Sequence, residues 1–116
     1  MLEAWMMEYI GTVECDYGLE KEEQIIIYGA GKVGRHALEV LKRAGWQNKV
    51  ACFCDSNKDM AGKAIDGVAI RGIEEAYAMY PTGTYLVASM CVRQMVETLL
   101  QYGIGKIHII RESPAE

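Results

Sequence analysis

Short apolar runs alternate along this chain with segments whose apolar residues recur at helical spacing. The run at residues 84–88 is continuously apolar after Thr84, as is typical of a parallel strand buried on both faces. Strands that alternate with helices in this way predict an α/β fold: a doubly wound parallel sheet of about five strands in the order 3-2-1-4-5. The expected strands lie at residues 25–28, 49–54, 68–70, 84–88 and 106–110.

The expected helices have recognisable boundaries. The first should begin near Lys32 and stop at Gly45, because glycine is favoured directly after a helix. A short second helix should end before Pro81, and a third should end at Gly103. Within the strand pattern, Asp66 and Gly67 separate two short apolar runs and predict a tight turn into the third strand.

An extra amphipathic helix is expected ahead of the first strand. Apolar residues at helical spacing over residues 2–13 give it one apolar stripe, which could pack on its own sheet, on a second copy of the chain as a homodimer, or on a catalytic domain that is missing. The expected division is therefore an N-terminal helix and linker (residues 1–20), a nucleotide-binding domain (residues 21–112) and a tail (residues 113–116).

A glycine-rich turn joins the first strand to the first helix. Gly29, Gly31 and Gly34 form the pattern GxGxxG, in which one glycine makes the tight turn, one lets phosphates approach the backbone and one lets helix and strand pack closely. The helix N-terminus would point its unpaired N–H groups at an anion over the turn. The same glycines could instead serve packing alone. The loop residues expected to contact a ligand are Gly29, Ala30, Gly31, Lys32, Val33 and Gly34.

An acidic residue follows the second strand at the spacing that this pattern requires. Asp55 lies about 20 residues beyond the glycines, where a carboxylate can accept both hydroxyls of an adenosine ribose and repel a 2′-phosphate. This favours NAD(H) as the ligand. Ser56 and Asn57 come next and could help to hold a ribose or base, although both residues are also common in turns.

The strand order predicts where the ligand lies. In the order 3-2-1-4-5 the crevice opens between the first strand and the strand that ends at Ala88. Ala88, Ser89 and Arg93 should then face the ligand opposite the glycine turn. Ser89 could equally be an N-cap of the helix that follows.

Charge and composition argue against nucleic-acid binding, membrane insertion and secretion. The 116 residues suit one domain, and the net charge is −4, with 12 basic and 16 acidic residues and no basic run. We therefore expect no nucleic-acid partner. No apolar stretch is long enough to insert into a membrane, and the N-terminus carries acids where a signal peptide needs bases, so we expect a cytoplasmic protein.

The candidate reactive side chains form no recognisable active site or metal site. The four cysteines (Cys15, Cys52, Cys54 and Cys91) match neither a disulfide scaffold nor a zinc site. Cys52 and Cys54 are expected to be buried thiols on one face of a strand, with a redox role for Cys54 as the alternative. We assign no catalytic residue and no metal ligand, and whether the chain is an enzyme stays open.

The glycine turn, Asp55, the element Gly62-Lys63-Ala64-Ile65-Asp66-Gly67-Val68 and a strand that ends in Ala-Ser carry a family resemblance. Over about residues 24–110 the chain resembles the Rossmann-like nucleotide-binding module of bacterial sugar-modifying proteins. Such modules precede nucleotide-sugar epimerase/dehydratase domains in capsule polysaccharide biosynthesis, and they form the N-terminal domain of sugar acyltransferases. The resemblance implies a dinucleotide or nucleotide-sugar ligand at Gly29, Gly31, Gly34 and Asp55.

Several functions remain open at this point. Hydride transfer needs a substrate half beside a cofactor half, and this chain has room only for the cofactor half. We therefore expect an NAD(H)-binding module that is part of, or a partner to, a larger sugar-modifying enzyme and is not catalytic alone. The alternatives are a UDP-sugar or coenzyme A binding domain, a stand-alone NAD(H) sensor similar to the regulatory domains of potassium channels, and a structural module with a vestigial site.

Overall fold

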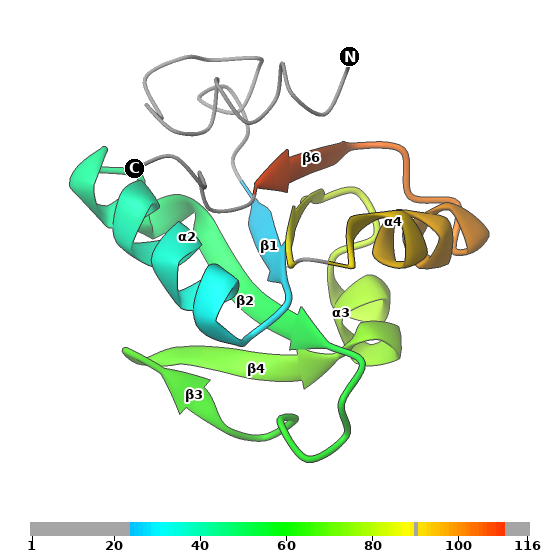
Figure 1. The fold of residues 1–116 in the computed structure, drawn as a ribbon, viewed down its shortest axis with the longest axis horizontal. Coiled ribbons are helices and arrows are strands. Elements are labelled where there is room, and N and C mark those ends of the chain that lie inside the picture. Colours follow the sequence, from blue (N-terminus) through cyan, green and yellow to red (C-terminus); the bar gives the residue numbers. More distant parts are fainter. Residues whose placement is uncertain (1–23, 90, 111–116) are drawn as a thin grey trace.

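A six-stranded sheet in the order β3-β4-β2-β1-β5-β6 forms the centre of the fold (Figure 1). The computed structural model describes residues 24–89 and 91–110. All neighbouring strands are parallel except β3 and β4, which form an antiparallel hairpin. The elements are β1 (Ile25–Tyr28), α2 (Lys32–Arg43), η2 (Gln47–Lys49), β2 (Val50–Asp55), β3 (Ala64–Ile65), β4 (Val68–Gly72), α3 (Ile73–Met79), β5 (Thr84–Ala88), α4 (Val92–Gln101) and β6 (Ile107–Ile110).

The central strand β1 is buried on both faces. It lies between β2 and β5, and its four residues are at most 1% exposed. Because side chains alternate along a strand, Ile25 and Ile27 face α2, whereas Ile26 and Tyr28 face α3 and α4. An unbroken apolar sequence is what a strand in this position requires.

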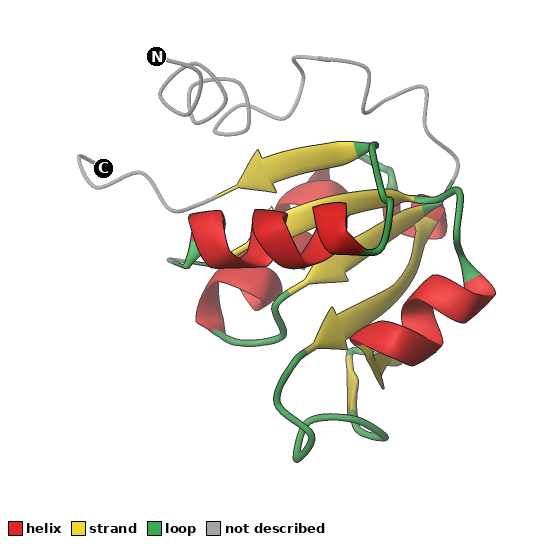
Figure 2. Ribbon diagram, turned by 90° about the vertical axis from the view of Figure 1, so that its right-hand side faces the viewer, coloured by secondary structure: helices red, strands yellow, loops and turns green. Residues whose placement is uncertain are grey.

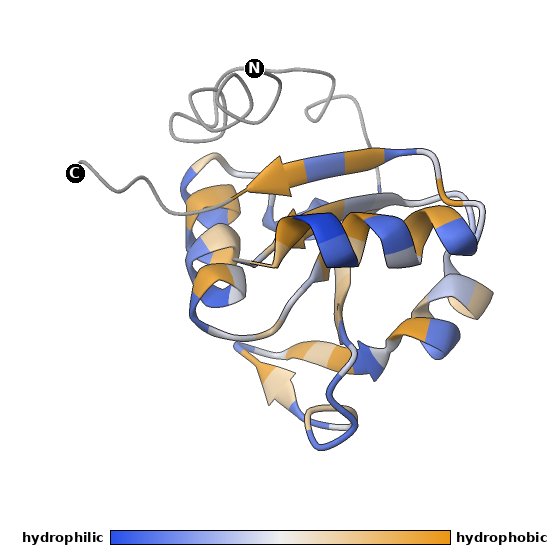
Figure 3. Cartoon of the chain, turned by 45° about the vertical axis from the view of Figure 1, so that its right-hand side comes forward, coloured by the Kyte–Doolittle hydropathy of each residue, from blue (hydrophilic) through white to orange (hydrophobic). Residues whose placement is uncertain are grey.

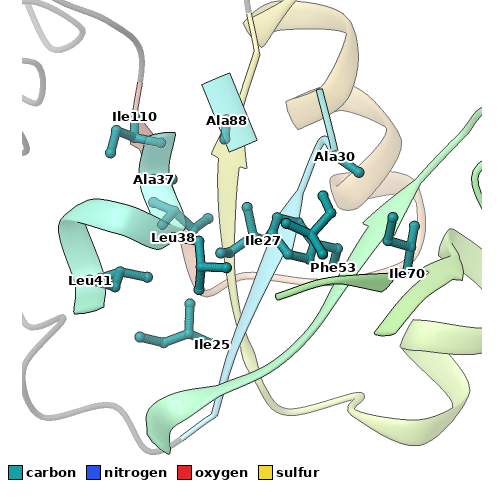
Figure 4. Close-up of a cluster of buried hydrophobic side chains, with 12 residues drawn as sticks. Ile25, Ile27, Ala30, Ala37, Leu38, Leu41, Phe53, Ile70, Ala88 and Ile110 are labelled. Atoms are coloured by element: carbon teal, nitrogen blue, oxygen red, sulfur yellow. The ribbon is translucent and has the colours of Figure 1, made fainter. Parts of the chain in front are cut away.

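Two apolar cores fill the space between the sheet and its helices. On one face Ala37, Leu38 and Leu41 of α2 pack against Ile27 and Phe53 (Figure 4). The other face lies under α3 and α4, which Figure 2 shows on the side of the sheet away from α2. Figure 3 shows the apolar side of α4 turned toward the strands and its hydrophilic side turned away. The sheet is thus covered on both faces.

The predicted fold class and strand order are confirmed. The expected order 3-2-1-4-5 corresponds to β4-β2-β1-β5-β6, and helix α2 begins at Lys32 as expected. Gly45 and Gly103 follow α2 and α4, and their N–H groups donate to Lys42 and Leu100 in the last turns of these helices.

Two details of the fold differ from the expectation. The residues before the Asp66-Gly67 turn also pair, so the sheet gains β3 as a sixth strand; two residues are too few for a periodic pattern to reveal. Leu100, one of the apolar residues that recur at helical spacing in this segment, is 58% exposed, because it is turned about 100° around the helix from buried Leu99. The expected N-terminal helix and the tail lie outside the described residues.

None of the helices that the structure describes within residues 24–89 and 91–110 is both long enough and apolar enough to cross a lipid bilayer.

Candidate functional site

The glycine turn brings three pieces of backbone together. Gly29 has φ +115°, a conformation that favours glycine, and a Cβ there would overlap the carbonyl oxygen of Ala88 on β5. A Cβ on Gly34 would overlap the carbonyl oxygen of Gly29. Helix α2, the turn and β5 are therefore in direct backbone contact, which only glycine at positions 29 and 34 permits.

Gly31 occupies a different environment. Apart from Gly31 itself and its two chain neighbours, no atom lies within 4 Å of the position that a Cβ on Gly31 would take, so its backbone faces open space. It is the N-cap of α2, and no side chain caps the helix there or supplies an acid to its first turn. The first N–H groups of a helix have no partner within the helix, so the positive end of α2 is open to a ligand.

Asp55 fastens the glycine turn to the end of β2. Its Oδ2 accepts a hydrogen bond of 2.8 Å from the N–H of Ala30, and its Oδ1 accepts one of 2.8 Å from the N–H of Asn57. The N–H of Gly29 also donates to the carbonyl of Cys54 at 2.8 Å. These bonds hold the turn at the carboxyl edge of the sheet.

Two hydroxyl groups complete the polar contacts of this edge. The Tyr28 hydroxyl lies 2.9 Å from Ser56 Oγ, which ties β1 to the loop after β2. Ser89 Oγ accepts a bond of 3.0 Å from the N–H of Cys91 just before α4. The N-cap of α4 is Cys91, without a side-chain cap, so Ser89 makes a local contact ahead of the helix and does not take the expected N-cap role.

A cavity of about 650 Å³ opens beside these groups, within the size range of small-molecule sites. One side is formed by the glycine turn and the end of β2, and the other by the end of β5 and by α4. Its lining residues are Tyr28, Gly29, Gly31, Lys32, Val33, Asp55, Ser56, Ala88, Ser89, Cys91, Gln94, Met95 and Thr98.

Most of the residues expected at the site border this cavity. Three residues of the glycine turn and the loop after β2 do not: the N–H of Ala30 is bonded to Asp55, Gly34 is packed behind the turn, and Asn57 is exposed in the next loop. Arg93, also expected to face the ligand, is exposed and does not line the cavity. The residues expected near the ligand that do line the cavity are Gly29, Gly31, Lys32, Val33, Asp55, Ser56, Ala88 and Ser89.

One wall of the cavity was missed by sequence reasoning. It consists of Cys91, Gln94, Met95 and Thr98, which lie at positions i, i+3, i+4 and i+7 and so share one side of α4. The spacing is visible in the sequence, but three of these residues are not clearly apolar, and a mixed stripe of this kind resembles a solvent-facing one. Tyr28 was likewise expected only as a residue of the first strand.

The cysteines fall into two groups. Cys52 and Cys54 are fully buried on β2; burial raises the pKa of the Cys52 thiol to about 11, against a smaller opposing effect of Arg71, and raises the pKa of Cys54 well above its usual value. Both are therefore protonated at neutral pH. Cys91 is exposed and borders the cavity. Cys15 lies outside the described residues.

Across the described part of the chain, no group of His, Cys, Asp and Glu side chains is placed to hold a metal ion.

The sequence of residues 20–113 matches the CoA binding domain family. The chain belongs to this family. The match contains the whole described sheet, the glycine turn and every residue that lines the cavity. A comparison with curated protein sequences found no match.

Solved structures share the fold of this CoA binding domain at low sequence identity. RSP, a Rex-family repressor, matches with a TM-score of 0.61 and 17% identity, over 82% of this chain and 55% of that chain. RSP in complex with β-NAD⁺ and operator DNA matches with a TM-score of 0.58 and 20% identity, over 82% and 52%. UDP-D-quinovosamine 4-dehydrogenase from Vibrio fischeri matches with a TM-score of 0.57 and 19% identity, over 81% and 80%. The chain thus spans about half the length of RSP.

The expectation of no nucleic-acid partner is wrong as an exclusion. It rested on the net charge of −4, yet a protein that shares this fold has been solved with operator DNA. The charge of one domain does not decide the partners of a protein in which that domain is about half of the chain.

The glycines provide a first test of this geometry. Gly34→Ala should lower the free energy of unfolding by about 1–3 kcal/mol, because the new Cβ meets the backbone of Gly29. Gly31→Ala should cost less than about 1 kcal/mol, because its Cβ meets open space at an N-cap. Urea unfolding of both variants measures the difference. Equal losses would contradict the close packing at Gly34.

Thiol labelling provides a second test. Iodoacetamide at pH 8 should modify Cys91 in the native protein and leave Cys52 and Cys54 unmodified, because a buried thiol whose pKa is raised offers neither access nor thiolate. Peptide mapping by mass spectrometry reads out each site, and labelling in urea is the control for intrinsic reactivity. Modification of Cys54 in the native protein would contradict its burial and support the alternative redox role.

Proposed function

We propose that this CoA binding domain is a nucleotide-binding module whose ligand is an NAD(H)-type dinucleotide. The observation that supports this most strongly is the meeting of the open N-terminus of α2, the bare backbone of Gly31 and the carboxylate of Asp55 in one cavity. In this proposal the pyrophosphate lies over the glycine turn, and the adenosine ribose lies at Asp55.

The charges around the turn suit a pyrophosphate. The N-terminus of a helix binds anions through its unpaired N–H groups and its dipole. Lys32 borders the cavity in the first turn of α2, where a cation is unfavourable unless an anion lies close. The open space beside Gly31 would let the phosphates approach these groups.

Asp55 keeps the capacity to bind a ribose. A carboxylate has about four lone-pair positions, and the N–H groups of Ala30 and Asn57 occupy two of them. The remaining positions can accept the two hydroxyls of an adenosine ribose. The fixed negative charge would repel the 2′-phosphate of NADP(H), so we expect a preference for NAD(H).

Proteins with the same fold support this ligand. RSP has been solved with β-NADH and with β-NAD⁺ and operator DNA. Two settings for an NAD(H) module follow from the fold neighbours. It serves as part of, or as a partner to, a larger sugar-modifying enzyme, as the match to UDP-D-quinovosamine 4-dehydrogenase favours, or as an NAD(H) sensor, as the match to a repressor favours.

Coenzyme A is a second candidate ligand, because the family to which the chain belongs is named for it. Coenzyme A and NAD(H) share an ADP unit, so the same glycine turn can hold either pyrophosphate. A UDP-sugar is the third candidate, and the fold match to the quinovosamine enzyme favours it.

The proposal also states that this domain binds the nucleotide and is not catalytic alone. Asp55 is the only acid that borders the cavity within the described residues, and both of its oxygens are already bonded to backbone. We propose residues 21–112 as the binding domain, with residues 1–20 and 113–116 outside it.

Titration calorimetry with NADH and NADPH tests the ligand and the role of Asp55 together. The native protein should bind NADH more tightly than NADPH. Asp55→Asn should reduce that preference by about tenfold, or 1.4 kcal/mol, because the 2′-phosphate no longer meets a carboxylate. Comparing the ratio of the two dissociation constants removes any general effect of the lost Ala30 contact.

Asp59→Asn is the matched control, because Asp59 is exposed in the same loop and does not border the cavity; it should leave the ratio unchanged. No saturable binding of NADH would contradict the NAD(H) proposal. If only coenzyme A or only a UDP-sugar bound, that compound would replace NAD(H) as the proposed ligand. An unchanged ratio in Asp55→Asn would contradict the ribose contact.

A further inference from the structure

The cavity has a charged side and an uncharged side. Lys32 and Asp55 are the two charged residues that line it within the described chain, and both lie by the glycine turn. The opposite wall, formed by α4, presents a thiol, an amide, a thioether and a hydroxyl (Cys91, Gln94, Met95 and Thr98). This asymmetry indicates a ligand with an anionic part and an uncharged part.

The two sides are close enough to contact one ligand. A Cβ on Gly29 would lie 3.5 Å from the terminal methyl of Met95, so α4 reaches over the glycine turn at this point. From Cys91 to Thr98 the wall extends for about 10 Å at the rise of an α-helix. A group attached to a pyrophosphate on the turn would therefore run along this wall.

Gln94 is the residue of the wall with a free hydrogen-bonding group. Its side chain is exposed, and within residues 24–89 and 91–110 no hydrogen bond involves its amide. The Thr98 hydroxyl, in contrast, already donates to the backbone carbonyl of Gln94 at 3.1 Å. A primary amide both donates and accepts, so it can pair with an uncharged ligand group that does both, and another amide is such a group.

We infer that the wall formed by α4 binds an uncharged, amide-bearing extension of the nucleotide, with Gln94 as its hydrogen-bonding partner and Met95 as its apolar contact. The inference rests on the proposed nucleotide function and names what the ligand carries beyond its pyrophosphate. Two sources supply this chemistry. One is the carboxamide of nicotinamide, and the other is the amide-containing arm of coenzyme A.

Two ligand pairs, each a full ligand and a form that lacks the amide-bearing extension, test the inference by calorimetry. NADH is compared with ADP-ribose, and coenzyme A with 3′-phospho-ADP. For one pair the full ligand should bind more tightly, and Gln94→Ala should weaken the full ligand by roughly three- to tenfold, as expected for one neutral hydrogen bond, while leaving the truncated ligand unchanged. The pair that responds identifies the source of the amide.

Gln101→Ala is the matched control, because Gln101 is an exposed glutamine on the same helix away from the cavity; it should change neither pair. Equal binding of full and truncated ligands in both pairs, or equal weakening of both by Gln94→Ala, would overturn the inference and leave the nucleotide site intact. If none of the four ligands binds, the proposed function and this inference fail together.

Discussion

The close backbone contact of α2, the glycine turn and β5 is the constraint on which the site depends. Gly34 lies against the carbonyl of Gly29, and Gly29 lies against the carbonyl of Ala88, so none of the three elements can move without the others. The contact fixes the N-terminus of α2 over the carboxyl edge of the central strand. The cavity is therefore defined by main-chain packing, and its side chains only modify it.

Hydrogen bonds to Asp55 also fix the position of the loop after β2 relative to the glycine turn. The carboxylate joins the turn, through Ala30, to the loop after β2, through Asn57, and the hydroxyls of Tyr28 and Ser56 join the same loop to β1. A loop that is already held needs less ordering when a ligand arrives, which favours affinity. Asp55 thus has a structural role as well as its proposed role in ligand recognition.

The sequence predicts the elements of this site better than the surface that faces a ligand. Parallel strands, the boundaries of α2, the three glycines and Asp55 follow from local patterns, because each depends on neighbours along the chain. The wall formed by α4 does not follow from a local pattern. Whether one side of a helix faces a cavity or solvent depends on how far the helix lies from the neighbouring elements of the fold. In the sequence, Gln94 and Thr98 resemble surface residues. The structure places Met95 beside Gly29, and Gln94 and Thr98 line the same cavity. Arg93 was expected to face the ligand, and it lies outside the cavity for the same reason.

Backbone amide NMR on the native protein tests the central claim, that a nucleotide binds over the glycine turn. Addition of NADH should shift the N–H resonances of Gly31, Lys32 and Val33 most strongly, because these groups lie at the open end of α2. The N–H of Gly62, which donates to the carbonyl of Ile70 and does not border the cavity, should not change. Shifts that leave residues 29–34 unchanged and gather elsewhere would contradict the account.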